Sequence, residues 1–220
     1  MAENPAAQPA KPGSRENKRF VQIQRICNAG CKYAGKERHN RMKNFPAPSI
    51  MRGMMNRWKP SATVAAVIER NVDGVQKFLL VEELTRDGLK FNNPAGHLDP
   101  GESPAQACAR ETLEETAFHF TPTHLVGVYL SRFERVEADS VLDITYLRFA
   151  FCGELGEFVN GLALDEGIVR TVWLTADEIR ASTDHHRSPL LLKCMEDYLA
   201  GKRFPIDLIT TDPSVLIINQ

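Results

Sequence analysis

Three glutamates, Glu111, Glu114 and Glu115, stand at positions i, i+3 and i+4 of a single short stretch. In a helix this spacing places them on one side, where three carboxylates repel one another. Hard cations such as Mg²⁺ prefer oxygen ligands, and a cation among the three would turn repulsion into binding. Beside a phosphate, such a cation could neutralise charge and activate water. On spacing alone a solvated helix face remains the alternative. The nearby Arg110 is expected to project away from the glutamates.

The segment that must position these glutamates carries clear helix signals. Ser103 is a suitable N-cap, Pro104 suits the first turn, and Gln106 completes a capping box, so a helix is predicted over 104–116. The preceding stretch "NNPAGHLDPGES" is rich in proline and glycine, which predicts a rigid turn with exposed backbone groups. One side of the helix consists of small residues that can pack closely on a sheet: Ala105, Cys108, Ala109, Thr112 and Thr116.

The sequence after residue 60 alternates between apolar runs and turn signals. Several strands around few helices favour an α/β sandwich or α+β domain over a doubly wound parallel sheet. "NVDGVQ" contains an Asp-Gly turn between the first two runs. Helices are predicted over 189–200 and in "ADEIRAS". The candidate strands are "ATVAAVIER", "KFLLVEEL", "THLVGVYLSRF", "VLDITYLRFAFCGEL" and "RTVWLT".

The net charge of −1 conceals a division of the 220-residue chain. Residues 1–60 carry 13 Lys and Arg against 3 Asp and Glu, whereas residues 61–220 carry 14 against 25. We therefore expect a basic, disordered N-terminal extension over 1–57, a folded domain over 58–212 and a C-terminal tail over 213–220. Five scattered cysteines and the lack of an apolar signal segment indicate a reduced, cytoplasmic protein that does not enter a membrane.

Three further interpretations concern the basic extension. It could contact RNA or another polyanion, because clustered positive charge attracts phosphates. Cys27, Cys31 and His39 could suggest zinc, but their spacing fits no standard site and a fourth ligand is missing. Met51, Met54 and Met55 directly precede the foldable sequence, so we hypothesise that one of them is the native start.

The acidic stretch resembles the box of the Nudix family, which runs Gly-x5-Glu-x7-Arg-Glu-U-x-Glu-Glu-x-Gly-U, with U a bulky aliphatic residue. Gly96, Glu102, Arg110 and the three glutamates match at the required spacing. The resemblance implies a Nudix-type α/β/α sandwich with a mixed central sheet and Mg²⁺-dependent hydrolysis of diphosphate linkages, with Mn²⁺ as a possible substitute. Thr112 replaces the usual aliphatic residue and Ala117 replaces the second glycine.

Carried over by position, the resemblance implies a role for each matching residue. Glu111, Glu114 and Glu115 would be the catalytic, metal-binding carboxylates, and Gly96 would offer its carbonyl to a metal. Glu102 would pair with Arg110 to hold the loop on the helix. Because the second box glycine usually adopts a left-handed turn, Ala117 would cost about 1 kcal/mol there, or the turn would take another shape.

Other candidates lie outside the box. Nudix enzymes often use a glutamate before a late strand as the general base, and Glu166 in "LDEGIVRTVW" fits that place, with a merely solvated residue as the alternative. Phe91 could stack on a base or belong to the core. Arg132 and Arg148 could neutralise phosphate or lie on the surface of a strand. Cys108 is expected to be a small buried residue and not a nucleophile.

The resemblance also reaches beyond the box, to the bacterial NudJ-type phosphatases over residues 58–209. It implies a small phosphorylated substrate: nucleoside tri- and diphosphates and the hydroxymethylpyrimidine diphosphate of the thiamine pathway. We expect a monomer or homodimer without a nucleic-acid partner. The alternatives are an RNA 5′-end pyrophosphohydrolase, with the basic extension as anchor, and a Nudix domain that binds nucleotides without cleaving them.

Overall fold

Strand β1 (Ser61–Val67) lies at the centre of the fold, because its residues from Thr63 to Val67 are buried. The computed structural model describes residues 58–137 and 140–216. In it, β1 pairs in parallel with β7 (Ser140–Phe158) and antiparallel with β5 (Ala95–His97). This sheet is therefore mixed, as predicted. Its strand order is β5, β1, β7, β6 (Phe118–Glu137) and β9 (Phe204–Pro205).

A second, antiparallel sheet forms around β3 (Val75–Thr85), which pairs with β2 (Glu69–Val72), β4 (Gly88–Asn92) and β8 (Ile168–Leu174). The predicted Asp-Gly turn joins β2 to β3. Asp73 and Gly74 both have positive φ angles, 53° and 82°, as tight hairpin turns require. A local sequence signal thus fixes the start of this sheet.

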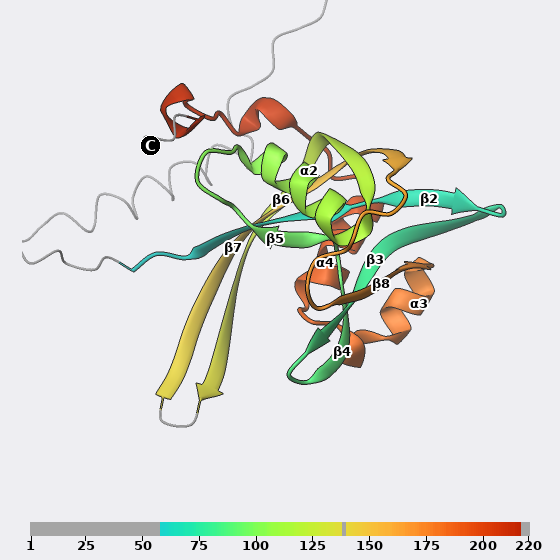
Figure 1. Cartoon of the computed structure of the whole chain (residues 1–220), viewed down its shortest axis with the longest axis horizontal. Coiled ribbons are helices and arrows are strands. Elements are labelled where there is room, and N and C mark those ends of the chain that lie inside the picture. The colour runs from blue at the N-terminus through green and yellow to red at the C-terminus, as the bar shows by residue number, and fades with distance from the viewer. Residues whose placement is uncertain (1–57, 138–139, 217–220) are drawn as a thin grey trace, which may run out of the picture. The chain divides into compact units, whose positions relative to one another are not determined.

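Helices cover both faces of these strands (Figure 1). Successive β1 residues point to opposite faces. Val64 and Ala66 pack in one core cluster with residues of α2 (Pro104–Thr116). Ala65 and Val67 pack in a second cluster with residues of α3 (Ala176–Ala181) and α4 (Leu190–Leu199). The three layers confirm the predicted α/β/α sandwich.

Strands β6 and β7 continue as a two-stranded ribbon beyond the end of β1 (Figure 1). The register of β1 on β7 begins at Ser61 opposite Tyr146, so the part of β7 before Tyr146 pairs with β6 alone. The predicted strands over these two segments are confirmed, although both are longer than the apolar runs that indicated them.

Three short strands were not predicted, and one of them lies in a segment predicted as a rigid turn. Within "NNPAGHLDPGES", residues 95–97 form β5, held by its pairing with β1. Three residues that follow Pro94 and include Gly96 carry little strand signal, so tertiary pairing decides their structure. The other two are β4, at 88–92, and β9, at 204–205. Short 3₁₀ turns complete the chain: η1 (Thr183–His185), η2 (Ile206–Leu208) and η3 (Pro213–Leu216).

The predictions made for residues 1–57 lie outside the described residues. These are the basic extension, the zinc ligands and the alternative start. Within 58–137 and 140–216, no helix is both long and apolar enough to cross a membrane.

Candidate metal centre and active site

Helix α2 begins as the sequence predicts. The Ser103 hydroxyl accepts a hydrogen bond from the Gln106 backbone amide at 3.2 Å, and the Gln106 side chain accepts from the Ser103 amide at 2.9 Å. The helix ends at Thr116, and Ala117 adopts the left-handed conformation with φ 58° and ψ 15°. Of the two possibilities for this position, the structure thus has the left-handed turn, at a cost of about 1 kcal/mol.

Apart from Glu111 and Glu115, the buried residues of α2 are small or β-branched. Cys108 and Thr112 are almost fully buried, and the Thr112 hydroxyl donates to the Cys108 carbonyl at 2.8 Å. Burial raises the pKa of the Cys108 thiol, which agrees with a structural rather than a nucleophilic role. Thr112 therefore replaces an aliphatic residue without leaving an unpaired hydroxyl.

The loop before α2 passes very close to the Glu111 side chain. A β-carbon added to Gly96 would meet the Glu111 carboxyl carbon at 2.0 Å. Only glycine can occupy this position without displacing the carboxylate. Gly96 belongs to β5 opposite Val64 of β1, so the central sheet holds the loop backbone against the helix.

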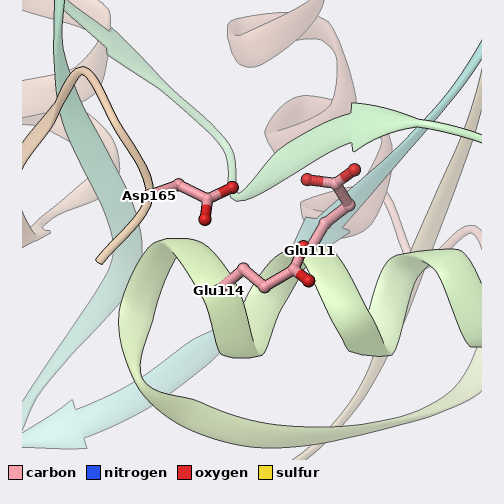
Figure 2. Close-up of side chains that lie close together, drawn as sticks. All are labelled: Glu111, Glu114 and Asp165. Atoms are coloured by element: carbon pink, nitrogen blue, oxygen red, sulfur yellow. The ribbon is translucent and has the colours of Figure 1, made fainter. Parts of the chain in front are cut away.

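Three carboxylates from two segments converge beside this loop. Glu111, Glu114 and Asp165 place an oxygen each within 4.8 Å of one another (Figure 2). Asp165 lies in the loop that leads into β8, and its backbone amide donates to the Glu114 carbonyl at 3.1 Å. Clustered carboxylate oxygens are the donor set that a hard divalent cation prefers. Within the part of the chain that the structure describes, these three carboxylates form a group that could hold a metal ion.

Asp165 was not predicted from the sequence. The sequence prediction chose its neighbour Glu166, which is exposed and lies outside the group of three. The adjacent acids in "LDEG" before a late strand were the available signal, but only the contact between this loop and α2 distinguishes them. A role for Glu166 as general base stays a prediction.

Glu115 belongs to the same helix, and its side chain faces the loop before α2. Its carboxylate accepts a hydrogen bond from the Ala95 backbone amide at 2.8 Å, and its side chain is buried. Burial raises the pKa of Glu115 to about 8, against the effect of the Ala95 amide and with a contribution from the charge of Glu111. Burial also raises the pKa of Glu111, with Arg110 opposing the shift. Both shifts arise mainly because burial disfavours the charged form of a carboxylate.

Arg110 does not project away from the glutamates, so that expectation was wrong. Its Nη1 donates to Glu111 Oε1 at 2.9 Å and to Glu114 Oε2 at 2.8 Å. Its Nε and Nη2 donate to the two oxygens of Glu102 at 3.0 and 2.8 Å, and Nη2 also reaches the His97 carbonyl. A helical wheel gives the direction of the α-to-β-carbon bond, but a long, flexible arginine can fold back along its own helix.

This network joins the loop to the helix through one guanidinium group. Glu102 also accepts from the Asp99 amide at 2.8 Å. The hydrogen bond from Arg110 lowers the pKa of Glu102, followed by that from Asp99, against the effect of burial. Charge-assisted bonds of this kind are the stronger class of hydrogen bond. Glu102 and Arg110 thus lie where the resemblance places a positioning pair.

The two candidate substrate contacts are not part of the group of three acids. Phe91 is partly buried against the core cluster that includes residues of α3 and α4, and its carbonyl accepts from the Arg187 amide. Arg132 is exposed on β6 and pairs with Asp143 at 2.8 Å and with Glu134. The structure does not bring either residue into the group of three acids. Arg148, in contrast, is buried in β7.

Comparison with known proteins defines the class. The NUDIX domain matches residues 59–194, which is more than half of the chain. The chain therefore belongs to the Nudix hydrolase family, and the mixed sheet and the box geometry agree with this assignment.

Individual relatives show which Nudix hydrolases the chain resembles. The chain is 34% identical over 152 residues to "Phosphatase NudJ" of Escherichia coli strain K12, covering 69% of this chain and 92% of that protein. The phosphatase NudJ of Shigella flexneri gives the same values. Among solved structures, a NUDIX hydrolase from Nitrosomonas europaea is 49% identical, with a TM-score of 0.61, and covers 70% of this chain and 98% of that one. The chain is thus a Nudix hydrolase similar to NudJ phosphatases.

Proposed function

We propose that this chain is a Mg²⁺-dependent phosphatase of small phosphorylated compounds, with Mn²⁺ as a substitute cation. Its substrates would be nucleoside tri- and diphosphates and hydroxymethylpyrimidine diphosphate. The observation that carries the proposal is the convergence of Glu111, Glu114 and Asp165 beside the Gly96 loop. The similarity to NudJ phosphatases supports the choice of substrates.

The residues of the site would have different roles in the reaction. Glu111, Glu114 and Asp165 would hold the cation, together with Glu115 and the Gly96 carbonyl. A cation bound there supplies positive charge to the phosphate oxygens and makes a bound water more acidic. Glu166, exposed beside Asp165, would accept the proton of the attacking water. Arg110 and Glu102 would keep the loop and the helix in place.

Phosphate release tests the proposal. The full chain is incubated with Mg²⁺ and with hydroxymethylpyrimidine diphosphate, nucleoside di- and triphosphates, a sugar nucleotide and a 5′-triphosphorylated RNA. We expect phosphate release from the small compounds, none in the presence of a chelator, and recovery when Mg²⁺ or Mn²⁺ is restored. Release from the RNA alone would contradict the proposal, and so would release that persists in the chelator.

A further inference from the structure

A second group of polar side chains is buried without a full set of hydrogen-bond partners. It lies beside the acidic site, by which we mean Glu111, Glu114, Glu115 and Asp165. Among the described residues, six buried side-chain atoms lack a hydrogen bond. They are Thr63 Oγ1, Glu83 Oε1, Asn92 Oδ1, Asn93 Oδ1, and Nε and Nη1 of Arg148. Buried polar groups are nearly always paired, since an unmet donor or acceptor costs about 1–3 kcal/mol. Several unmet atoms close together therefore point to a ligand.

Four of these residues lie next to one another. Thr63 and Arg148 are direct partners across the parallel strands β1 and β7. The Asn92 side chain acts as a hydrogen-bond donor toward the Glu83 carboxylate, which leaves the Asn92 oxygen without a partner. The charges of Glu83 and Arg148 influence each other. We call these four residues the buried polar cluster. Each exposes at most 9% of its surface.

The buried polar cluster adjoins the acidic site. The carboxylate of Glu83 is close enough to Glu115 to raise the pKa of Glu115, in addition to the larger effect of burial. Glu83 Oε2 is already paired with Arg187, from the segment before α4. Its other oxygen has no partner. A substrate whose phosphate lies near α2 could therefore reach the cluster with its remaining part.

The unmet atoms decide what kind of group fits. Arg148 offers two donor nitrogens, whereas Glu83 and Asn92 offer acceptor oxygens, and the Thr63 hydroxyl can do either. A phosphate at neutral pH carries acceptors only, so the Glu83 carboxylate would repel it and the Asn92 oxygen could not bond to it. A nitrogen heterocycle with an amino group beside a ring nitrogen or carbonyl carries donors and acceptors side by side, and would satisfy both halves of the cluster.

We propose that Thr63, Glu83, Asn92 and Arg148 form the subsite that recognises the amino-substituted heterocycle of the substrate. This inference rests on the proposed hydrolase function and specifies the part of the substrate that is not phosphate. Arg148 donates to the ring nitrogen or carbonyl of the heterocycle. Glu83 and Asn92 accept hydrogen bonds from its amino group.

Substrate pairs that differ in one group test the subsite with the full, unaltered chain. The two pairs are CTP against UTP and ATP against ITP, in which an amino group is exchanged for a carbonyl and the phosphates are identical. We expect kcat/KM for the amino member to be at least about fivefold higher in one or both pairs, since one hydrogen bond contributes about 1 kcal/mol. Ratios below fivefold in both pairs, or a preference for the carbonyl member, would overturn the assignment.

The same assay separates this inference from the proposed function. Equal hydrolysis of all four nucleotides would contradict the proposed subsite and would still support the proposed hydrolase function. If none is hydrolysed, the proposed function fails for nucleotides. Calorimetric titration of CMP and UMP into the chain then tests the subsite independently of hydrolysis. Tighter binding of CMP then supports the subsite, and equal or no binding overturns it.

Arg148→Met gives a second, independent readout. Because a buried guanidinium without a carboxylate partner destabilises a fold, its removal should raise the melting temperature. If Arg148 binds the heterocycle, the amino-to-carbonyl ratio of kcat/KM should fall at least about fivefold. Arg180→Met removes an exposed arginine that pairs with Glu196 on α4, and serves as the control with an unchanged ratio. A ratio that survives Arg148→Met overturns the assignment, whatever the melting temperature.

Discussion

The backbone amide of Asp165 donates a hydrogen bond to the carbonyl of Glu114 across 3.1 Å. This contact fixes the loop before β8 to the last turns of α2, although about fifty residues separate the two in the chain. It brings the Asp165 carboxylate beside those of Glu111 and Glu114. Two adjacent acids in this loop, Asp165 and Glu166, therefore lie in different surroundings.

Asp165→Asn and Glu166→Gln should have different kinetic effects. Asp165→Asn removes one charge from the group of Glu111, Glu114 and Asp165, which we call the three-acid group. The Mg²⁺ concentration for half-maximal activity should therefore rise roughly tenfold or more. Glu166→Gln removes the predicted base, so kcat should fall roughly 10²- to 10⁴-fold with little change in the Mg²⁺ requirement. Initial rates measured over a range of Mg²⁺ concentrations distinguish the two.

Each half of this comparison can fail separately. A Glu166→Gln variant with nearly full kcat would show that Glu166 is not the base. An Asp165→Asn variant with an unchanged Mg²⁺ requirement would show that Asp165 lies near the cation site without contributing to it.

Gly96→Ala should inactivate the site without unfolding the chain. The added methyl group would overlap the Glu111 carboxylate, which must move away from its neighbours. Displacement of a catalytic group by about 1 Å can cost roughly 100-fold in rate, so a loss of this size in kcat/KM is expected. Steady-state kinetics and circular dichroism together measure activity and folding.

Gly74→Ala is the matched control for Gly96→Ala. Gly74 lies in the turn between β2 and β3 with φ 82°, and a β-carbon there meets nothing within 4 Å. Its replacement should cost about 1 kcal/mol of stability through backbone strain. Activity should be kept. Comparable kcat/KM in the two variants would contradict the role given to Gly96.

Asp197 should stabilise the fold at neutral pH and lose this effect in acid. Its carboxylate accepts from Lys193 and Lys202 at 2.6 and 2.8 Å and from the Tyr129 hydroxyl at 3.1 Å. Burial acts to raise the pKa of Asp197, but these partners together outweigh it and lower the pKa below its ordinary value. The stabilisation is therefore complete above the ordinary value and is lost as the pH falls through the folded-state value.

Urea unfolding of Asp197→Asn measures this contribution. At pH 7 the variant should have a free energy of unfolding lower by roughly 1–2 kcal/mol, because the Asp197 carboxylate is buried but its two lysine partners are half-exposed and screened by solvent. The difference from the unaltered chain should shrink below about pH 4. Glu196→Gln is the control, since its exposed pair with Arg180 should contribute about 1 kcal/mol or less. A difference that stays constant from pH 7 to pH 3 would contradict the assignment of charge to Asp197.

Local signals in the sequence predicted the structure where local interactions decide it. Ser103 and Gln106 are three residues apart, and their reciprocal hydrogen bonds fix the start of α2. Asp73 and Gly74 set the hairpin turn by their own conformational preferences. Residues 95–97 had no such signal, because β5 exists only through its pairing with β1.

Side-chain positions that depend on backbone far away in the chain could not be predicted from local sequence signals. The position of Asp165 follows from the contact of its loop with α2, and the sequence offered two adjacent acids without a means to choose. Arg110 turns back to Glu111 and Glu114 because four carboxylate and carbonyl groups lie within its reach. Its direction depends on these neighbours and not on helical periodicity.

Binding of a divalent cation at the three-acid group tests the central claim most directly. Mg²⁺ and Mn²⁺ are titrated calorimetrically into the full chain and into its Glu114→Gln variant, with a non-hydrolysable diphosphate present. We predict binding by the unaltered chain and an affinity at least about tenfold weaker in the variant. No heat of binding with the unaltered chain, or equal affinity in both proteins, would contradict the account.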